Sequence, residues 1–472
     1  MKNVIVFCFV AMGLSITFAQ NKQVLYGMEE IPQSLLLNPG GRVSTKAHYG
    51  IPFFSQIHLN GGSSGVTVFD IFGNTGGDIN DKITRKIFEL KNTDFFTATQ
   101  QLEIINFGWR AQNEMYFSGG IYQELDFIAY FPRDLAILGW EGNRDYIDYE
   151  FDFADINTTG DLLTVYHFGA NKQINKKLTV GIRAKLYSSL FNYRSTNNSG
   201  TFVTRIAEPG GENFYEHTVQ DANVTVETSG IASLSDLDGG EIAKEVLGRA
   251  FFGGNIGIGV DLGATYDITN RITASASVLD FGTIFHSKDV ETYRASGTYT
   301  LDGIELIFPP LSDGDEALPY FDDLEDEIEE EIPIDTLTNK YSQMRPLKVN
   351  ASVQYNFGKA VGNGDDCDCR NMGGGIDRTQ AVGLQFYSIY RPKGPQMAGT
   401  VFYYRRLFDF LSAKATYTVD SYSASNVGLG LVADLGKFNF YVAADNLLRY
   451  NNLAKAKSVS LQLGFNIKID EE

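Results

Sequence analysis

The stretch SVSLQLGFNIKID, from Ser458 to Asp470, alternates between apolar and polar positions without interruption. The apolar positions are Val459, Leu461, Leu463, Phe465, Ile467 and Ile469, and each is followed by a polar residue or a glycine. Because successive side chains of a β-strand point to opposite faces, this stretch predicts a strand with one apolar and one polar face. Such strands are typical of a transmembrane β-barrel, whose apolar face contacts lipid and whose polar face lines the lumen.

Similar segments recur throughout the chain and predict an all-β fold, a closed antiparallel barrel of about 14 strands. Short turn-like segments join many of them in pairs, as expected for an up-and-down barrel. The predicted strands are residues 44–59, 97–110, 114–125, 162–172, 177–193, 255–267, 271–285, 346–358, 378–391, 396–406, 411–420, 426–435, 437–449 and 458–470.

The connections between these strands are sorted by length. If the C-terminus lies in the periplasm, the long insertions all fall on the extracellular side, and most periplasmic connections are short turns. The exception is the Gly- and Asp-rich connection 359–377. A soluble β-protein has no reason to sort its loops in this way. The long insertions are residues 60–96, 126–161, 194–250 and 287–345.

Residues 1–19 have the pattern of a secretory signal peptide, with Lys2, an apolar core and a small-residue cleavage site ending at Ala19. The alternative, a retained anchor helix, is disfavoured because the apolar run is short. A signal peptide before a barrel predicts location in the outer membrane. Residues 20–43 are too irregular for a strand and are expected to form a hatch or plug in the lumen of the barrel domain, residues 44–472.

The net charge of −19 makes nucleic acid an implausible partner. Part of the acidity is concentrated in residues 313–331, interpreted as a solvated extracellular loop, with cation binding or a basic partner as the alternative. Behind the leader, Cys367 and Cys369 remain. Their spacing leaves a tight disulfide open and provides too few ligands for a zinc site.

No pattern in the sequence indicates catalysis, a metal site or a bound cofactor. The five histidines are scattered singly, without a second ligand or base at useful spacing. Gly257, Gly259 and Gly263 resemble a dinucleotide-binding loop, but their spacing is wrong and they lie within a predicted strand. An enzyme is therefore not expected.

Several polar side chains are predicted to face the lumen. Arg183, Lys185 and Tyr187 lie on the polar face of one strand, and Lys348 and Gln354 on that of another. Such groups hold a plug by ion pairs or tune a pore, and the first role is favoured because a large barrel must fill its interior.

Helical spacing occurs within three of the insertions. Ile79, Ile83, Ile87 and Leu90 share one helical face, and so do Ile242 and Val246. A third apolar face is predicted at residues 321–328. Packing onto the barrel mouth is favoured over binding of a partner.

Some motifs resemble a Bacteroidota family of outer-membrane proteins of unknown function. They are Glu30–Gly40, which contains Ser-Leu-Leu-Leu-Asn-Pro-Gly, and the segments Gln101–Ile104, Glu124–Tyr130 and Tyr193–Gly200. A more distant resemblance is to long-chain fatty acid transporters and the type IX secretion barrel, through Asn38-Pro39, Leu279–Gly282 and Asp445–Leu447. In those transporters the early segment forms a hatch, which implies that role for Asn38, Pro39 and Gly40.

Two functions follow from the sequence as hypotheses. In the first, the barrel passes or hands over a hydrophobic or small polar solute across the outer membrane. In the second, it is a non-conducting docking scaffold, or an accessory subunit, for a secretion or assembly complex. The partners expected are outer-membrane lipid, such a solute, and other envelope proteins.

Overall fold

The computed structural model describes residues 23–112, 114–207, 214–234, 237–301, 334–360 and 378–469. The predicted signal peptide, the acidic segment 313–331 with its predicted helix, and both cysteines of connection 359–377 lie outside the described residues. Within the described ranges, no helix has the length and apolar character needed to cross a membrane.

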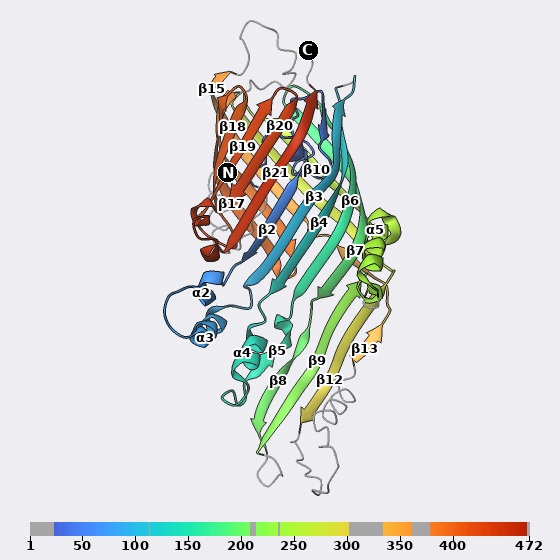
Figure 1. Cartoon of the computed structure of the whole chain (residues 1–472), viewed down its shortest axis with the longest axis vertical. Coiled ribbons are helices and arrows are strands. Elements are labelled where there is room, and N and C mark those ends of the chain that lie inside the picture. The colour runs from blue at the N-terminus through green and yellow to red at the C-terminus, as the bar shows by residue number, and fades with distance from the viewer. Residues whose placement is uncertain are drawn as a thin grey trace, which may run out of the picture.

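The chain forms a closed antiparallel transmembrane β-barrel of 14 strands, as predicted (Figure 1). The first wall strand consists of two pieces, β1 and β2, which pair with β21 on one side and β3 on the other, and this pairing closes the barrel. The wall elements are β1 (Ala47–Gly50), β2 (Ile57–Ser63), β3 (Phe95–Arg110), β4 (Tyr116–Tyr130), β6 (Thr158–Gln173), β7 (Leu178–Ser195), β10 (Asn255–Asp267), β11 (Ile272–His286), β15 (Lys348–Ala360), β16 (Arg378–Arg391), β17 (Gly394–Phe408), β18 (Leu411–Val419), β19 (Asn426–Leu435), β20 (Phe438–Asp445) and β21 (Ser458–Ile469).

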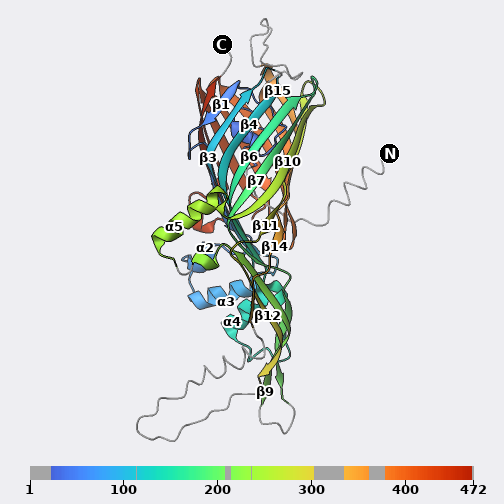
Figure 2. The same ribbon diagram turned by 90° about the vertical axis from the view of Figure 1, so that its right-hand side faces the viewer.

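The two ends of the barrel differ, because the long insertions all project from one of them (Figures 1 and 2). We call these the long-loop end and the short-turn end. The connections at the long-loop end contain α2 (Val68–Phe72), α3 (Ile79–Glu89), α4 (Arg133–Glu141), α5 (Gly239–Gly248), β5 (Glu150–Asp152), β8 (Ser199–Ile206), β9 (Tyr215–Ser229), β12 (Val290–Leu301), β13 (Ile334–Leu337), β14 (Tyr341–Met344), η2 (Phe153–Asp155), η3 (Ala232–Leu234) and the π-helical turn η4 (Arg249–Gly253). The turns η5 (Leu447–Arg449) and η6 (Leu453–Lys455) lie in the shorter connection between β20 and β21 at the same end.

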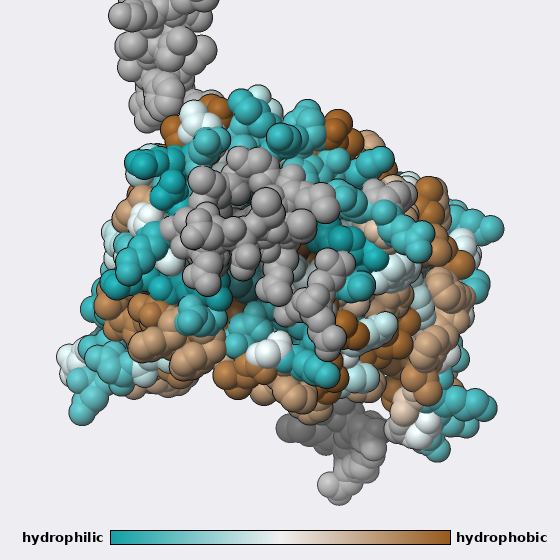
Figure 3. Space-filling view, turned by 90° about the horizontal axis from the view of Figure 1, so that it is seen from above, coloured by the Kyte–Doolittle hydropathy of each residue, from teal (hydrophilic) through white to brown (hydrophobic). Residues whose placement is uncertain are grey.

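The wall strands place polar side chains toward the lumen and apolar side chains on the outer surface, as the alternating pattern predicts. In β21 the polar positions Gln462, Asn466 and Lys468 are buried in the lumen, whereas Leu461 and Phe465 are exposed on the outer surface. Seen end-on from the short-turn end, apolar residues gather along parts of the margin, with polar residues between them and toward the middle (Figure 3). The exterior is therefore the apolar surface that a bilayer requires.

Aromatic rings gather on the outer face near the short-turn end. Trp109 contacts Phe107, Phe117 and Phe168, with ring centroids 5.5–6.1 Å apart. Aromatic side chains are enriched where a membrane meets water, so this cluster marks one boundary of the apolar band.

Several strand bounds differ from the prediction. The first strand, predicted as continuous, is broken at residues 51–56, where Phe53 has a positive φ of 63° and points outward. The predicted strand 437–449 ends at Asp445, because Asn446 takes a left-handed conformation that starts the turn η5. The alternation fails at both breaks, at Phe54-Ser55 in the first and at Asn446-Leu447 in the second, so the sequence carried a signal that the predicted bounds did not use.

The insertions are more regular than predicted. Within residues 194–250 and 287–345, strands β8, β9, β12 and β13 extend the sheet well beyond the barrel. Helix α3 forms where it was predicted, but Ile87 packs with Ile137 of α4 and Phe151 of β5 rather than onto the barrel mouth. The insertions therefore form an outer module with an apolar core of its own.

A charge on the lipid face should destabilise the barrel according to its depth. Leu384 lies at the middle of β16 and is 62% exposed, whereas Leu435 lies at a turn and is 59% exposed. We expect Leu384→Arg to lower the free energy of unfolding by roughly 2–4 kcal/mol and Leu435→Arg by about 0–1 kcal/mol. Urea unfolding in lipid vesicles measures both, and equal effects of the two variants would contradict a bilayer around β16.

Candidate functional site in the barrel lumen

The N-terminal segment, residues 23–43, lies inside the barrel. It contains the 3₁₀ turn η1 (Pro32–Leu36) and buries an unusual number of apolar side chains. Several of them pack against Val432, Tyr441 and Ala443 on the lumen face of β19 and β20. The segment fills space that a barrel of this width would otherwise leave to water. Its buried apolar residues are Val24, Leu25, Tyr26, Met28, Ile31, Leu35, Leu36 and Leu37.

Side chains of the wall donate hydrogen bonds to backbone carbonyl groups of this irregular segment. Lys414 Nζ and Gln385 Nε2 donate to the carbonyl of Tyr26 at 2.6 and 3.0 Å. Ser277 Oγ donates to the carbonyl of Leu37 at 2.6 Å. Turns within the segment bond other carbonyl groups, such as those of Leu25, Met28 and Ile31, and the wall side chains supply donors where these internal bonds are missing. These contacts hold the segment in the lumen, and the chain continues from it into β1 at Ala47.

Two of the motifs quoted from the sequence meet in the lumen. Gln33 Nε2 donates to Glu103 Oε2 at 3.0 Å and to Asn466 Oδ1 at 2.8 Å, and Asn466 Nδ2 donates back to Gln33 Oε1 at 2.9 Å. Gln33 comes from the Ser-Leu-Leu-Leu-Asn-Pro-Gly motif segment and Glu103 from the Gln101–Ile104 segment. Their contact joins the N-terminal segment to β3 and β21.

Asn38, Pro39 and Gly40 lie directly against the wall. Asn38 Oδ1 accepts a hydrogen bond from the Gly40 amide at 3.0 Å, which makes a tight turn. A Cβ atom added to Gly181 of β7 would lie 2.0 Å from the carbonyl oxygen of Pro39, and one added to Gly263 of β10 would lie 2.1 Å from Asn38 Oδ1. The close approach of the two backbones therefore requires glycine in the wall.

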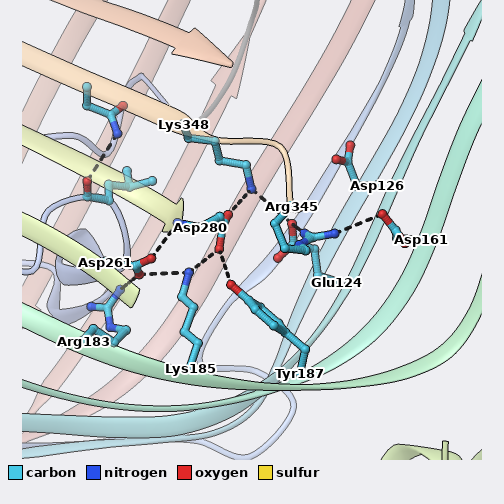
Figure 4. Close-up of polar contacts among 12 residues, drawn as sticks. Glu124, Asp126, Asp161, Arg183, Lys185, Tyr187, Asp261, Asp280, Arg345 and Lys348 are labelled. Atoms are coloured by element: carbon cyan, nitrogen blue, oxygen red, sulfur yellow. Dashed lines mark hydrogen bonds and ion pairs between the residues drawn. The ribbon is translucent and has the colours of Figure 1, made fainter. Parts of the chain in front are cut away.

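A chain of buried ion pairs lies beside the segment on β7, β10 and β11 (Figure 4). Lys185 Nζ lies 2.9 Å from Asp261 and 2.5 Å from Asp280, and Arg183 lies 3.2 Å from Asp261. Arg183 also donates to the backbone carbonyl of Leu35. This contact links the N-terminal segment to the charged groups of the wall.

The chain of ion pairs continues across the lumen. Lys348 lies 2.8 Å from Asp280 and 3.2 Å from Glu124, although β6, β7, β10 and β11 separate its strand from β4. Arg391 of β16 lies 2.8 Å from Asp126 of β4. The pairs thus bridge opposite walls. We call these ten residues the charged belt: Glu124, Asp126, Asp161, Arg183, Lys185, Asp261, Asp280, Arg345, Lys348 and Arg391.

The belt balances its charges, since five carboxylates face five cations in the pairs named above. Arg345 is shared between Glu124 at 3.0 Å and Asp161 at 3.1 Å and also covers the ring of Tyr187 at 5.6 Å. Charges removed from bulk water need such pairing, because an unpaired buried charge is strongly unfavourable.

Four of the five residues predicted to face the lumen lie in or against the belt: Arg183, Lys185, Tyr187 and Lys348. The Tyr187 hydroxyl donates to Asp280 at 3.3 Å. Gln354 is separate, because it lies nearer the short-turn end and donates to Asn356 at 3.1 Å.

Sequence reasoning did not single out the carboxylates of the belt. Glu124, Asp126 and Asp261 lie on the polar faces of strands whose residues alternate between apolar and polar. This alternation therefore indicates that their side chains point into the lumen. Asp280 is harder, because the β10–β11 pairing shifts register there and Asp280 takes a positive φ of 60°. Its amide donates to Asp261 Oδ1 at 2.7 Å, which stabilises this bulge.

Two hollow spaces lie in the lumen, one lined by wall and belt residues toward the long-loop end and the other lined partly by the N-terminal segment toward the short-turn end. The long-loop space has an empty volume of ≈ 540 Å³, including the part open to solvent, and Thr97, Glu124, Arg391 and Gln396 are among its lining residues. The short-turn space has an empty volume of ≈ 460 Å³ on the same measure. Asn38, Arg42 and Gln354 line it.

In the part of the chain that the structure describes, His, Cys, Asp and Glu side chains do not form a group of three or more that could hold a metal ion.

The fold and the lumen define a transmembrane β-barrel with an occupied interior. The match to a family model covers residues 39–445, and the chain therefore belongs to the "Family of unknown function (DUF5723)". The matched region contains the whole charged belt, and it begins within the N-terminal segment, at Pro39. No curated protein sequence matches the chain.

Solved structures that resemble the chain include a toluene transporter and a FadL homologue. The chain is similar to the toluene transporter TbuX of Ralstonia pickettii, with 10% identity over 93% of this chain and 94% of that chain and a TM-score of 0.40. A FadL homologue of Pseudomonas aeruginosa has 9% identity over 96% and 99% of the two chains and a TM-score of 0.43. At such low identities and TM-scores, the likeness does not extend to solute or mechanism.

Breaking the belt at its centre should destabilise the barrel. Asp280 pairs with both Lys185 and Lys348, so Asp280→Asn leaves two buried cations without this carboxylate. We expect the free energy of unfolding to fall by roughly 3–5 kcal/mol. The matched control is Asp145→Asn, which breaks an exposed pair with Arg144 and should cause no measurable change. Chemical unfolding in detergent micelles measures both, and an unchanged midpoint for Asp280→Asn would show that the remaining carboxylates, Asp261 and Glu124, suffice to pair the two lysines.

Proposed function

We propose that this protein is an outer-membrane barrel that passes or hands over a hydrophobic or small polar solute, with residues 20–43 acting as its hatch. The observation that carries the proposal is the occupied lumen: the described part of this segment, residues 23–43, is buried inside the barrel and lines the short-turn space. Hydrogen bonds and apolar contacts hold it against the wall. Displacing it would leave the space that it fills to water or to a solute.

The orientation follows from the connections. Bacterial barrels place long loops outside the cell and short turns in the periplasm. On that basis the long-loop space opens toward the exterior and the short-turn space toward the periplasm. The cleavage of a signal peptide after Ala19 would place the N-terminus of the mature chain close to the start of the hatch, where it can move without unfolding the wall.

The contacts of the hatch indicate how it is held. Arg183, Ser277 and Lys414 all bond its carbonyl groups, and Asn38 to Gly40 press against Gly181 and Gly263. The first three residues belong to the wall, so they would stay in place while the hatch leaves. We therefore assign Arg183 to holding the hatch, with Lys185, Tyr187 and Lys348 fixing the belt behind it. Gln354 is assigned to the periplasmic space.

Removing the hatch should open the barrel. We expect a chain lacking residues 20–43 to conduct ions in planar bilayers, with a unit conductance at least about tenfold that of the full chain, because the segment fills the lumen. Single-channel recording measures the change. Adding a synthetic peptide of residues 23–43 should lower the conductance again.

A smaller change tests the same idea without a deletion. Gly181→Ala places a Cβ 2.0 Å from the Pro39 carbonyl, whereas the exposed Gly399 has open space around its Cβ position. Gly181→Ala should therefore raise the frequency of opening, and Gly399→Ala should not. Persistent closure of both the deletion variant and Gly181→Ala would count against transport.

The second candidate function, docking of envelope proteins, is favoured by the outer module. Strands β8, β9 and β12 carry the sheet beyond the barrel (Figure 2), and apolar side chains are exposed near the tip of β8 and β9. Ile206 is 71% exposed and Phe214 is 87% exposed. A solute channel does not require such a projection, whereas a docking surface does.

Docking predicts a loss of partners when this tip is made polar. Ile206→Glu combined with Phe214→Glu should at least halve the recovery of co-purifying envelope proteins, measured by mass spectrometry after capture from native membranes. Phe72→Glu, at an equally exposed site on α2, is the matched control. An unchanged set of captured proteins in the double variant would argue against docking through β8 and β9.

A further inference from the structure

One helical segment of the long loops lies against the outside of the barrel. It consists of α5 and the turn η4, residues 239–253, and both side views place α5 beside the wall at the long-loop end (Figures 1 and 2). The Tyr166 hydroxyl of β6 donates to the carbonyl of Ala250 at 2.8 Å, and the rings of Tyr166 and Phe252 stack with their centroids 4.3 Å apart. Tyr166 lies on the outward face of its strand, because it is paired with Leu186, which is 46% exposed. The segment is therefore attached to the face of the wall that meets lipid.

A buried arginine fixes the segment in this position. Arg249 is 4% exposed and donates to the carbonyl of Leu190 at 3.1 Å. Its other guanidinium nitrogens donate to Ser233 Oγ at 2.7 Å and to Asp289 at 3.2 Å. Ser188 Oγ of β7 donates in turn to the carbonyl of Arg249 at 2.6 Å. Because these contacts hold the segment on the wall, its exposed side chains are presented in a fixed place.

The sides of α5 differ in polarity. Its least exposed face is formed by Ile242, Val246 and Arg249. With about 3.6 residues per turn, Ala243 and Leu247 lie on one side of this face, and Glu241 and Glu245 lie on the other. A helix that rests on a wall with one apolar flank and one charged flank has the pattern expected where hydrocarbon meets water.

The apolar flank continues into the lipid-facing surface of the barrel. Leu247 is 61% exposed, and Phe251 in η4 is 65% exposed. Next to them, Tyr166, Leu186 and Ile258 form one row across β6, β7 and β10, and Ile258 is 55% exposed. A cluster of exposed apolar side chains marks a surface that is covered in the native environment. Since the adjoining row faces the bilayer, lipid is the partner that fits this flank.

The backbone of the segment is also paired as a site poor in water requires. Side chains outside the segment donate to three carbonyl groups near its C-terminal end, those of Arg249, Ala250 and Gly253. The last of these bonds comes from Lys288 Nζ at 2.9 Å. Next to hydrocarbon, water does not replace such donors, and an unpaired carbonyl group is costly there.

We propose that α5 and η4 form an interfacial helix, with Leu247 and Phe251 among the lipid acyl chains and Glu241 and Glu245 at the polar surface of the bilayer. Helices of this kind bury their apolar side roughly 5–10 Å into the boundary between headgroups and acyl chains. The segment thus sets the level of the membrane at the long-loop end, opposite the aromatic cluster near the short-turn end. This inference goes beyond the proposed function and does not depend on whether the barrel carries a solute.

Tryptophan fluorescence of the full chain in lipid vesicles tests this placement. Trp109→Phe and Trp140→Phe remove the two natural tryptophans. Phe251→Trp then places one tryptophan on the segment, and Phe214→Trp, at a site that is 87% exposed in the unaltered chain, is the matched control. We expect lipids with brominated acyl chains to lower the emission of Phe251→Trp by about twofold or more and to leave that of Phe214→Trp unchanged. Iodide in the buffer should quench the two in the opposite order.

The position of the bromine along the acyl chain measures depth. Bromine near the ester end should quench Phe251→Trp more than bromine near the methyl end, whereas Leu384→Trp in the middle of β16 should show the opposite order. Stronger quenching of Phe251→Trp by the deeper bromine would therefore overturn the interfacial placement.

Two further outcomes would overturn the inference. Equal quenching of Phe251→Trp and Phe214→Trp by iodide would place the segment in water. Shielding of Phe251→Trp from both quenchers would show that protein, such as a second copy of this chain, covers the flank. Leu247→Trp repeats the measurement at the second exposed position, and heat-dependent mobility in electrophoresis shows that each variant is folded.

Discussion

Hydrocarbon cannot form hydrogen bonds, and this constraint underlies the whole architecture. The wall must close on itself so that every backbone amide and carbonyl finds a partner strand, and its outward side chains must be apolar. The polar half of each alternating strand is therefore forced inward. In β21 this places Gln462, Asn466 and Lys468 in the lumen. Polar groups in the lumen need hydrogen-bond or ion-pair partners. The N-terminal segment supplies some of these partners, and the residues of the charged belt pair with one another.

The belt shows how the interior meets this need. Its carboxylates and cations come from strands distant in sequence, and each is paired at 2.5–3.2 Å. Pairing of this kind offsets the loss of hydration more than it adds net stability. Its main effect is geometric, because Lys348 and Arg391 connect opposite walls and restrict the width of the lumen. Because the belt fixes the width of the lumen, the proposed hatch occupies a space whose shape does not change.

The hatch combines two kinds of contact that differ in consequence. Its apolar residues, such as Leu25 and Ile31, are buried and favour the closed state through their area. Its hydrogen bonds to wall side chains can be replaced by hydrogen bonds to water, whereas its apolar contacts have no such replacement. Release of this segment, as proposed above, would therefore be opposed mainly by its apolar contacts.

The sequence by itself determined the barrel, the number of its strands, the side on which long insertions lie and the inward face that carries Arg183, Lys185 and Lys348. These features depend on an alternation with a period of two, which is local and visible in any one segment. The tertiary structure decided which charges pair, because Lys348 meets Glu124 across a lumen whose width and stagger emerge when the sheet closes. It also decided the position of Asp280, where a bulge interrupts strand parity, and the extension of the sheet into β8, β9 and β12. Such features depend on contacts between residues far apart in the chain, which no local pattern encodes.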